Sequence, residues 1–168
     1  MNAEAFRHFY AYHLTENRKI WDSYIAPLSY AQFTEDSNYS HGSVQDQIIH
    51  LMSVDEVWFC ELRGVEPSEP FVPANADDRD ILRAHWNRVE QSMRNYLAEL
   101  RDDTLFEKPI KEPEEDKDLI VWQVLLHVVN HGTDHRAQVL RLLNDLGVKT
   151  SSQDYLFYVY DHLGDQGS

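Results

Sequence analysis

The sequence contains a single cysteine, Cys60, among 168 residues. One cysteine cannot form an internal disulfide, and there is no Cys-x-x-Cys pair that could build a redox centre or a thiolate zinc site. The fold must therefore be held by an apolar core, and the hydrophobic fraction of 42% is that of an ordinary globular chain. This composition suits a reducing compartment.

Long apolar segments and positive charge are also scarce. No apolar run reaches the roughly 18 residues that a membrane-spanning helix needs. The first residues, MNAEAFRHFYAYH, lack the basic and then apolar order of a signal peptide. Fifteen Lys and Arg against 29 Asp and Glu give a formal net charge of −14, which disfavours contact with a phosphate backbone or an anionic membrane. We therefore expect a cytoplasmic protein whose partners include neither nucleic acid nor a membrane.

Proline is confined to three places: Pro27, the stretch 67–73, and the pair at 109 and 113. Because proline breaks helix interiors, these places divide the chain into four long proline-free segments. Apolar residues recur at helical spacing in each segment and predict helices at about residues 2–26, 44–63, 77–100 and 119–146. The sequence thus predicts an all-α fold, a four-helix bundle in one domain over residues 1–168.

Several helix ends carry specific signals. Ser43 and Asp46 approximate a capping box at the start of the second helix, and Gly64 and Gly147 supply left-handed stops after the second and fourth helices. The aromatic tail, residues 154–163, fits either a short helix or a strand. Its apolar side chains predict packing on the bundle or on a partner.

Two histidines interrupt the apolar stripe of the fourth helix. His131 and His135 are four residues apart, so their imidazoles lie one turn apart on one face and can converge on one ion. Two buried imidazoles without partners would cost roughly 1 to 3 kcal/mol each, and a metal ion would remove that cost. Satisfaction by carbonyl groups or water is the alternative. The full stripe comprises Val124, Val128, His131, His135, Val139, Leu142 and Leu146.

His50 is the best candidate for a third ligand. It lies within the second helix, beside the main apolar seam rather than in its centre. Taken alone, such a residue fits a boundary histidine as well as a ligand, and helical spacing cannot pair it with the fourth helix.

The stretches HGSVQDQIIHLMSVDEVWFCELRG (residues 41–64) and VWQVLLHVVNHGTDHRAQVLRLLNDLGV (residues 121–148) resemble the two signature helices of the DinB-like superfamily. Weaker similarity covers most of the remaining chain. The first helix of that pattern matches here at His50, Glu56, Trp58, Arg63 and Gly64. The second matches in HGTDHRAQ, with Ala137 where glycine is commoner.

The resemblance implies a four-helix bundle with crossover connections and one divalent metal ion on His50, His131 and His135, with open coordination positions. Homodimers are frequent in the superfamily. Zinc or nickel is expected first, with iron, cobalt or manganese as alternatives. Some relatives are metal-dependent transferases or isomerases that use a low-molecular-weight thiol. The resemblance therefore favours a thiol S-transferase or hydrolase-like activity on a small electrophilic substrate; a noncatalytic metal- or small-ligand-binding protein of the stress response is the alternative.

Other motifs and side chains give weaker indications of chemistry. No Glu lies between the histidines of HGTDH as in a His-Glu-x-x-His peptidase, no Glu-x-x-His suits a di-iron bundle, and no nucleophile-elbow sequence suits Ser-His-Asp catalysis. Three polar residues near the ligands could orient an imidazole or meet substrate, although helix capping or a solvated face explains them equally well: Asp46, Asp134 and Gln138. His127 is rotated away from His135, and Cys60 fits a small buried hydrophobe. Five histidines show no ligand spacing: His8, His13, His41, His85 and His162.

Overall fold

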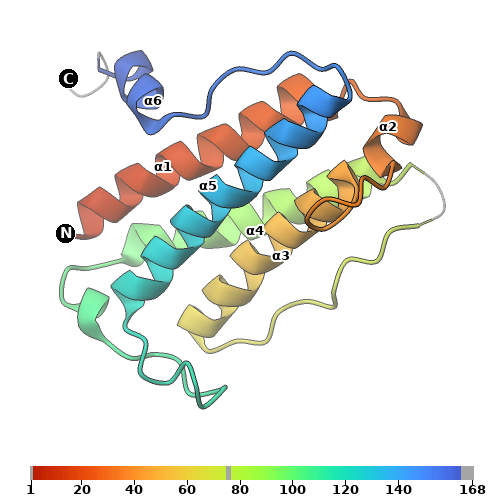
Figure 1. The fold of residues 1–168 in the computed structure, drawn as a ribbon. Coiled ribbons are helices and arrows are strands. Elements are labelled where there is room, and N and C mark those ends of the chain that lie inside the picture. Colours follow the sequence, from red (N-terminus) through yellow and green to blue (C-terminus); the bar gives the residue numbers. More distant parts are fainter. Residues whose placement is uncertain (1, 75–76, 164–168) are drawn as a thin grey trace.

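The computed structural model describes residues 2–74 and 77–163 and is built from helices (Figure 1). Residues 1, 75–76 and 164–168 of the predicted domain lie outside this description. No strand occurs in the described residues, which confirms the all-α prediction. In chain order the elements are α1 (Ala3–Ile20), the π-helical turn η1 (Trp21–Ile25), α2 (Tyr30–Thr34), α3 (Val44–Arg63), α4 (Arg79–Glu99), the 3₁₀ turn η2 (Thr104–Phe106), α5 (Val121–Asp145) and α6 (Tyr155–Asp161).

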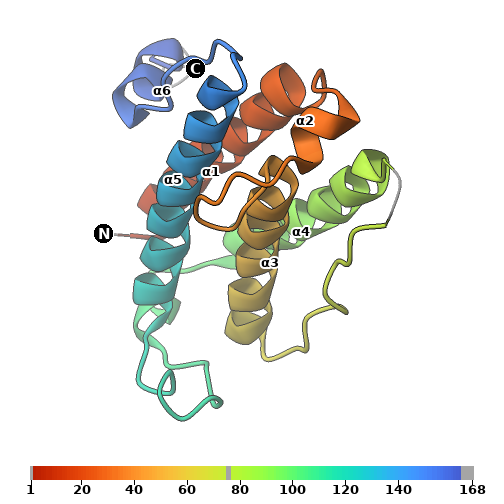
Figure 2. The same cartoon turned by 45° about the vertical axis from the view of Figure 1, so that its right-hand side comes forward.

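Four long helices pack around one core. Helix α3 lies against α5 and α4, and α1 also lies against α5 and α4. Helices α1 and α5 run in one direction, and α3 and α4 run in the other (Figures 1 and 2). Because α3 and α4 are consecutive and run the same way, a crossover connection joins them. The side chains between the helices are at most 1% exposed and include Phe6, Ile20, Ile48, Met52, Leu82, Met93, Leu125 and Val128.

The expected helix ends are present. Ser43 and Asp46 form a reciprocal capping box at the start of α3, and Gly64 ends that helix in the left-handed region with φ of 63°. Gly147 follows α5 with φ of 79°. These signals depend only on residues that are neighbours in the chain, which is why the sequence places both ends of α3 correctly. Among the helices of the described residues, none is both long and apolar enough to cross a bilayer.

The aromatic tail forms the short helix α6, which packs against α1. Tyr155 and Tyr158 contact Tyr12 with ring centroids 5.3 and 5.5 Å apart. The opposite face of the tail remains exposed and comprises Leu156, Phe157, Tyr160 and Leu163.

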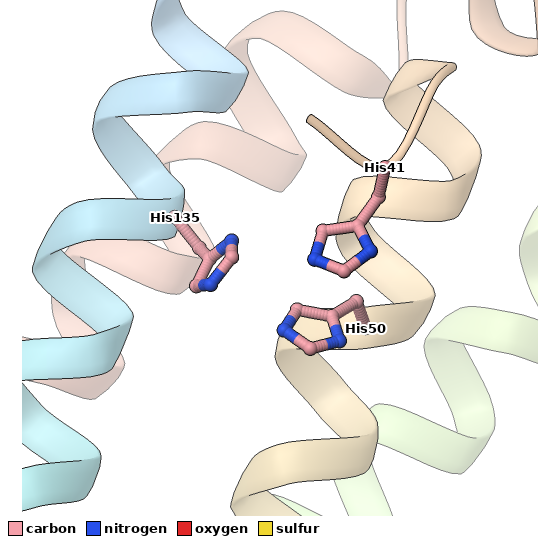
Figure 3. Close-up of side chains that lie close together, drawn as sticks. All are labelled: His41, His50 and His135. Carbon is pink, nitrogen blue, oxygen red and sulfur yellow. The ribbon is translucent and has the colours of Figure 1, made fainter. Parts of the chain in front are cut away.

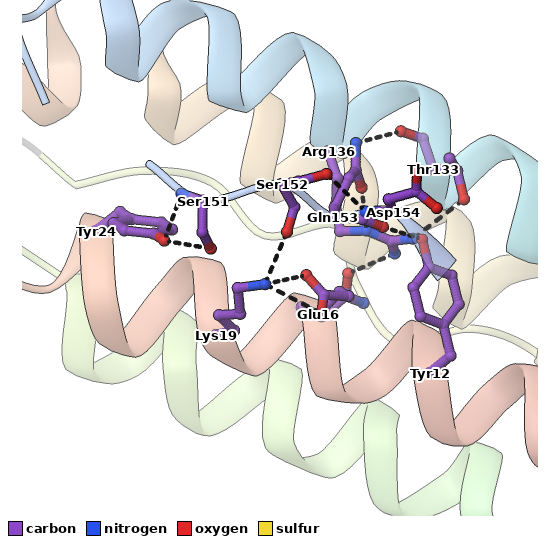
Figure 4. Close-up of polar contacts among 11 residues, drawn as sticks. Tyr12, Glu16, Lys19, Tyr24, Thr133, Arg136, Ser151, Ser152, Gln153 and Asp154 are labelled. Atoms are coloured by element: carbon purple, nitrogen blue, oxygen red, sulfur yellow. Dashed lines mark hydrogen bonds and ion pairs between the residues drawn. The ribbon is translucent and has the colours of Figure 1, made fainter. Parts of the chain in front are cut away.

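A buried arginine ties α5 to α1 and to the segment before α6 (Figure 4). Arg136 is 0% exposed. Its guanidinium donates to His13 Nδ1 and Asn17 Oδ1 of α1, both at 3.0 Å, and to Gln153 Oε1 at 2.8 Å. It also donates to Thr133 Oγ1 within α5 at 3.1 Å. Arg136 directly follows His135, so this network anchors the turn of α5 that carries a predicted ligand.

Gly132 allows α5 to approach α1 closely. A β-carbon at this position would lie 2.6 Å from Nδ1 of His13 and closer still to Cε1 of the same ring. That ring cannot easily move, because it is 0% exposed and hydrogen-bonded to Arg136.

We expect Gly132→Ala to lower the free energy of unfolding by about 1–2 kcal/mol. A contact this close belongs to the upper part of the overpacking cost, about 2–3 kcal/mol, and the better helix propensity of alanine returns about 1 kcal/mol. Urea unfolding of the metal-free protein measures the change. Asn130→Ala, at an exposed position of the same helix, is the matched control and should stay within about 0.5 kcal/mol of the parent. Equal stability of Gly132→Ala and the parent would contradict the close approach.

Candidate metal centre

The three histidines predicted as ligands lie together between α3 and α5. His50 on α3 and His131 on α5 face each other with their Nε2 atoms 3.3 Å apart. The ring centroid of His135 lies 4.1 Å from that of His131 and 4.5 Å from that of His50. Because α3 packs beside α5, His50 lies next to His131 and His135. Their ligation of an ion stays a prediction.

A fourth imidazole, that of His41, joins this cluster (Figure 3). His41 comes from the loop before α3, and its ring stacks on that of His50 with centroids 3.8 Å apart. Ligand atoms of His41, His50 and His135 all lie within 4.8 Å of one another, so these three could hold a metal ion. His41, which shows no ligand spacing in the sequence, thus lies beside two of the predicted ligands. Sequence spacing carries no signal for it, because loop conformation decides where its side chain points.

The facing nitrogens of His50 and His131 have a separation that one divalent ion could span. Two nitrogens that each lie about 2.0–2.1 Å from a tetrahedral zinc ion are about 3.3 Å apart, which is the separation of the Nε2 atoms of His50 and His131. In addition, the buried Nδ1 of His131 has no hydrogen-bond partner within the described residues. One nitrogen of His131 thus faces another imidazole, and the other has no partner in the described part of the chain. The hydrogen-bonding capacity of this side chain is poorly satisfied for a residue with a purely structural role.

Gln47 orients His135. Its side-chain Oε1 lies 3.3 Å from Nδ1 of His135, and both side chains are buried. An amide oxygen can only accept, so Nδ1 carries the proton and the lone pair of Nε2 is free to bind an ion. Gln47 lies one turn before His50 on α3. The sequence interpretation missed it, because only the packing of α3 on α5 brings it to His135.

The surroundings of His50, His131 and His135 favour their neutral forms. Burial lowers the pKa of His50 to about 4, with help from His41 and His135. Burial and the nearby His135 and His50 lower the pKa of His131 to about 4, against the opposing charge of Asp55. Burial and then His41 also lower the pKa of His135. Neutral imidazoles are the form that binds metal, so these residues are ready for ligation near neutral pH.

These pKa shifts predict how the stability of the metal-free protein depends on pH. Unfolded histidines take up protons below their ordinary pKa of 6.5, whereas folded His50 and His131 stay neutral until about pH 4. Protons therefore bind the unfolded state first, and the free energy of unfolding should fall as the pH drops from 6.5 towards 4. Urea titrations at several pH values in this window measure the slope. His131→Ala should flatten it; an unchanged slope in that variant would contradict the assignment.

The polar neighbours of the predicted ligands have structural roles. Asp46 caps α3. The side chain of Gln138 accepts a hydrogen bond from Ser40 in the loop that carries His41, and donates to Asp134 at 3.1 Å. The ring of His127 contacts that of Trp58 with centroids 5.2 Å apart and that of His131 with centroids 5.7 Å apart.

Ser68, His85 and Glu56 also lie together, near the other end of α3. Nε2 of His85 lies 3.2 Å from Ser68 Oγ and 2.9 Å from Glu56 Oε2, and the hydroxyl of Ser68 lies 2.6 Å from Glu56 Oε1. In a hydrolytic triad the base uses one ring nitrogen for the serine and the other for the carboxylate. Here both contacts fall on the same nitrogen, so this cluster is not arranged as a triad.

Cys60 is the one thiol of the chain, and it is poorly suited to nucleophilic attack. The side chain is buried and lines a cavity of about 340 Å³ between α3 and α4, together with Arg63 and His85. Burial raises the pKa of the thiol, and the charge of Glu56 raises it further. The thiolate is therefore disfavoured at neutral pH.

The family model described as the DinB family matches residues 1–165. No curated protein matches the chain significantly.

Proposed function

Because the chain belongs to the DinB family, we propose that it is a metal-dependent enzyme with a thiol S-transferase or hydrolase-like activity on a small electrophilic substrate. His50, His131 and His135 hold one divalent ion in this proposal. The observation that carries it is the 3.3 Å separation of the facing Nε2 atoms of His50 and His131 beside His135.

Each side chain has a role that the contacts support. His50 and His131 supply Nε2 atoms from two different helices, and Gln47 holds His135 in the tautomer whose Nε2 is free. When bound, the ion supplies Lewis acidity, which lowers the pKa of a thiol or water that it binds. Histidine nitrogens suit zinc or nickel first, with iron, cobalt or manganese as alternatives.

The chemistry of Cys60 favours an external thiol. Its pKa is raised by burial, and its cavity lies between α3 and α4, whereas the histidines of the candidate centre come from α3, α5 and the loop before α3. A nucleophile for transfer would then come from a low-molecular-weight thiol. Such a small partner also agrees with a net charge of −14, which disfavours polyanions.

Two measurements test the proposal. Elemental analysis of protein purified without an affinity tag should find close to one divalent ion per chain. Metal-loaded protein, incubated with a panel of low-molecular-weight thiols and a model electrophile such as 1-chloro-2,4-dinitrobenzene, should then show thiol-dependent turnover that a chelator abolishes.

The same measurements separate the second candidate, a noncatalytic metal- or small-ligand-binding protein. A stoichiometric ion without turnover for any pair of thiol and electrophile would favour this binding role. Protein without any bound ion, even after incubation with zinc, nickel or cobalt, would overturn the enzyme and the metal-binding role.

We further propose a homodimer located in the cytoplasm. The exposed apolar face of the tail supports the dimer, because its members are 50–64% exposed: Leu156, Phe157, Tyr160 and Leu163. Light scattering at micromolar protein should give about twice the chain mass of 19.8 kDa. A mass equal to that of one chain would contradict the dimer.

A further inference from the structure

His41 differs from the other members of the cluster in how it is held. His50, His131 and His135 project from α3 and α5, two long helices that pack directly against each other. His41 projects from the loop of residues 35–43, which joins α2 to α3. Its side chain is exposed, but its ring is in contact with the ring of His50. One imidazole of four can therefore move without disturbing the core.

The loop is shaped to present His41 to the cluster. The residues on both sides lie in the left-handed region, with φ of 50° for Ser40 and 99° for Gly42. Ser37 Oγ donates to the carbonyl oxygen of Gly42 at 2.6 Å, which closes the loop on itself. A non-glycine residue such as Ser40 adopts this backbone conformation at a cost, so other contacts must hold it there.

One such contact ties the loop to the helix that carries two of the predicted ligands. The hydroxyl of Ser40 donates to Oε1 of Gln138, which lies on α5 one turn after His135. This hydrogen bond is exposed. It holds His41 over His50 and His135, but an exposed hydrogen bond contributes little net stability, so the loop can release it readily.

The number of imidazoles decides how many positions on the ion stay open. A tetrahedral ion has four positions, and three protein ligands leave one for a reacting molecule, whereas four close the site. The ring centroid of His41 lies 3.8 Å from that of His50 and 5.4 Å from that of His135. A small loop movement would therefore bring a nitrogen of His41 to the ion proposed between the other three imidazoles.

We propose that His41 is an exchangeable fourth ligand: it closes the coordination sphere in the resting protein and yields its position to an incoming thiol when the loop releases. This inference rests on the proposed three-histidine centre and adds a mechanism that controls access to it. The helical ligands keep the ion in place while the loop ligand leaves.

Cobalt(II) loaded into the metal-free protein provides the test, because its visible absorption reports the number and type of ligands. His41→Ala should keep stoichiometric cobalt, and its absorption spectrum should change. Its cobalt affinity should be about tenfold weaker, which is the low end of the loss expected when a group that supports a metal site is removed. Titration with 2-mercaptoethanol should give tighter thiol binding in His41→Ala than in the parent, because no protein ligand has to be displaced. Ser40→Ala, which removes the hydrogen bond to Gln138, should shift thiol binding in the same direction by a smaller factor.

His127→Ala is the matched control. It removes an exposed imidazole of α5 that contacts Trp58 and His131, and its spectrum and thiol titration should match the parent. A His41→Ala protein indistinguishable from the parent would overturn the inference and leave the three-histidine centre intact. Complete loss of cobalt in His41→Ala would also overturn it, because His41 would then be a permanent ligand. Retention of cobalt in both His131→Ala and His135→Ala would instead overturn the proposed centre itself.

Discussion

Replacing His131 or His135 with alanine will yield protein that no longer retains a stoichiometric metal ion after purification. Each change removes one of the three proposed nitrogen donors on the helices. Removing a group that only hydrogen-bonds to a metal ligand weakens metal binding by up to about 100-fold, so removing a ligand should weaken it by more than about 100-fold. The helices should persist, because alanine has the highest helix propensity and the core around Val128 and Val139 is untouched. Elemental analysis of untagged protein and circular dichroism measure the two effects.

The control for this prediction is again His127→Ala, on the same helix one turn before His131. It should retain the ion at the parent stoichiometry. If His131→Ala and His135→Ala both retain one tightly bound ion, these residues are not ligands and the centre must be built from other groups. If all three variants lose the ion together with their helical signal, the loss reports unfolding rather than ligation.

Replacing Arg136 with methionine will destabilise the metal-free protein by about 3–5 kcal/mol, because four polar groups each lose a hydrogen bond that contributes about 1 kcal/mol. The guanidinium is 0% exposed and bonds to His13, Asn17, Thr133 and Gln153. Methionine fills much of the volume but leaves these groups without their donor. Urea unfolding followed by circular dichroism measures the loss.

Arg141→Met provides a matched comparison, since it makes the same change on the same helix. Arg141 is exposed and pairs with Asp145 four residues later, 2.9 Å from its carboxylate. An exposed pair of this kind contributes about 0.3–0.5 kcal/mol, so Arg141→Met should be nearly neutral. Similar losses in the two variants would show that the buried network around Arg136 does not contribute specially to stability.

The regular helices follow from local chemistry. The helix ends can be predicted without coordinates, because their signals involve only neighbours in the chain. These signals are the prolines, the capping box at Ser43 and the left-handed conformation of Gly64. The shared face of His131 and His135 is equally local, because residues four apart on a helix are neighbours in space. The sequence pattern also indicates His50, and the resemblance to a family supplied its pairing with the two histidines of the fourth helix.

Docking between helices and loop conformation determine the rest. Gln47 contacts His135 only because α3 packs on α5. Gly132 and Arg136 lie against His13 only because α5 packs on α1. His41 lies on a loop whose left-handed residues turn its ring towards His50. Helical periodicity specifies which face a side chain occupies, but not which other helix or loop that face meets. The neighbours of the histidines, and with them the number of imidazoles at the centre, are therefore properties of the packed chain.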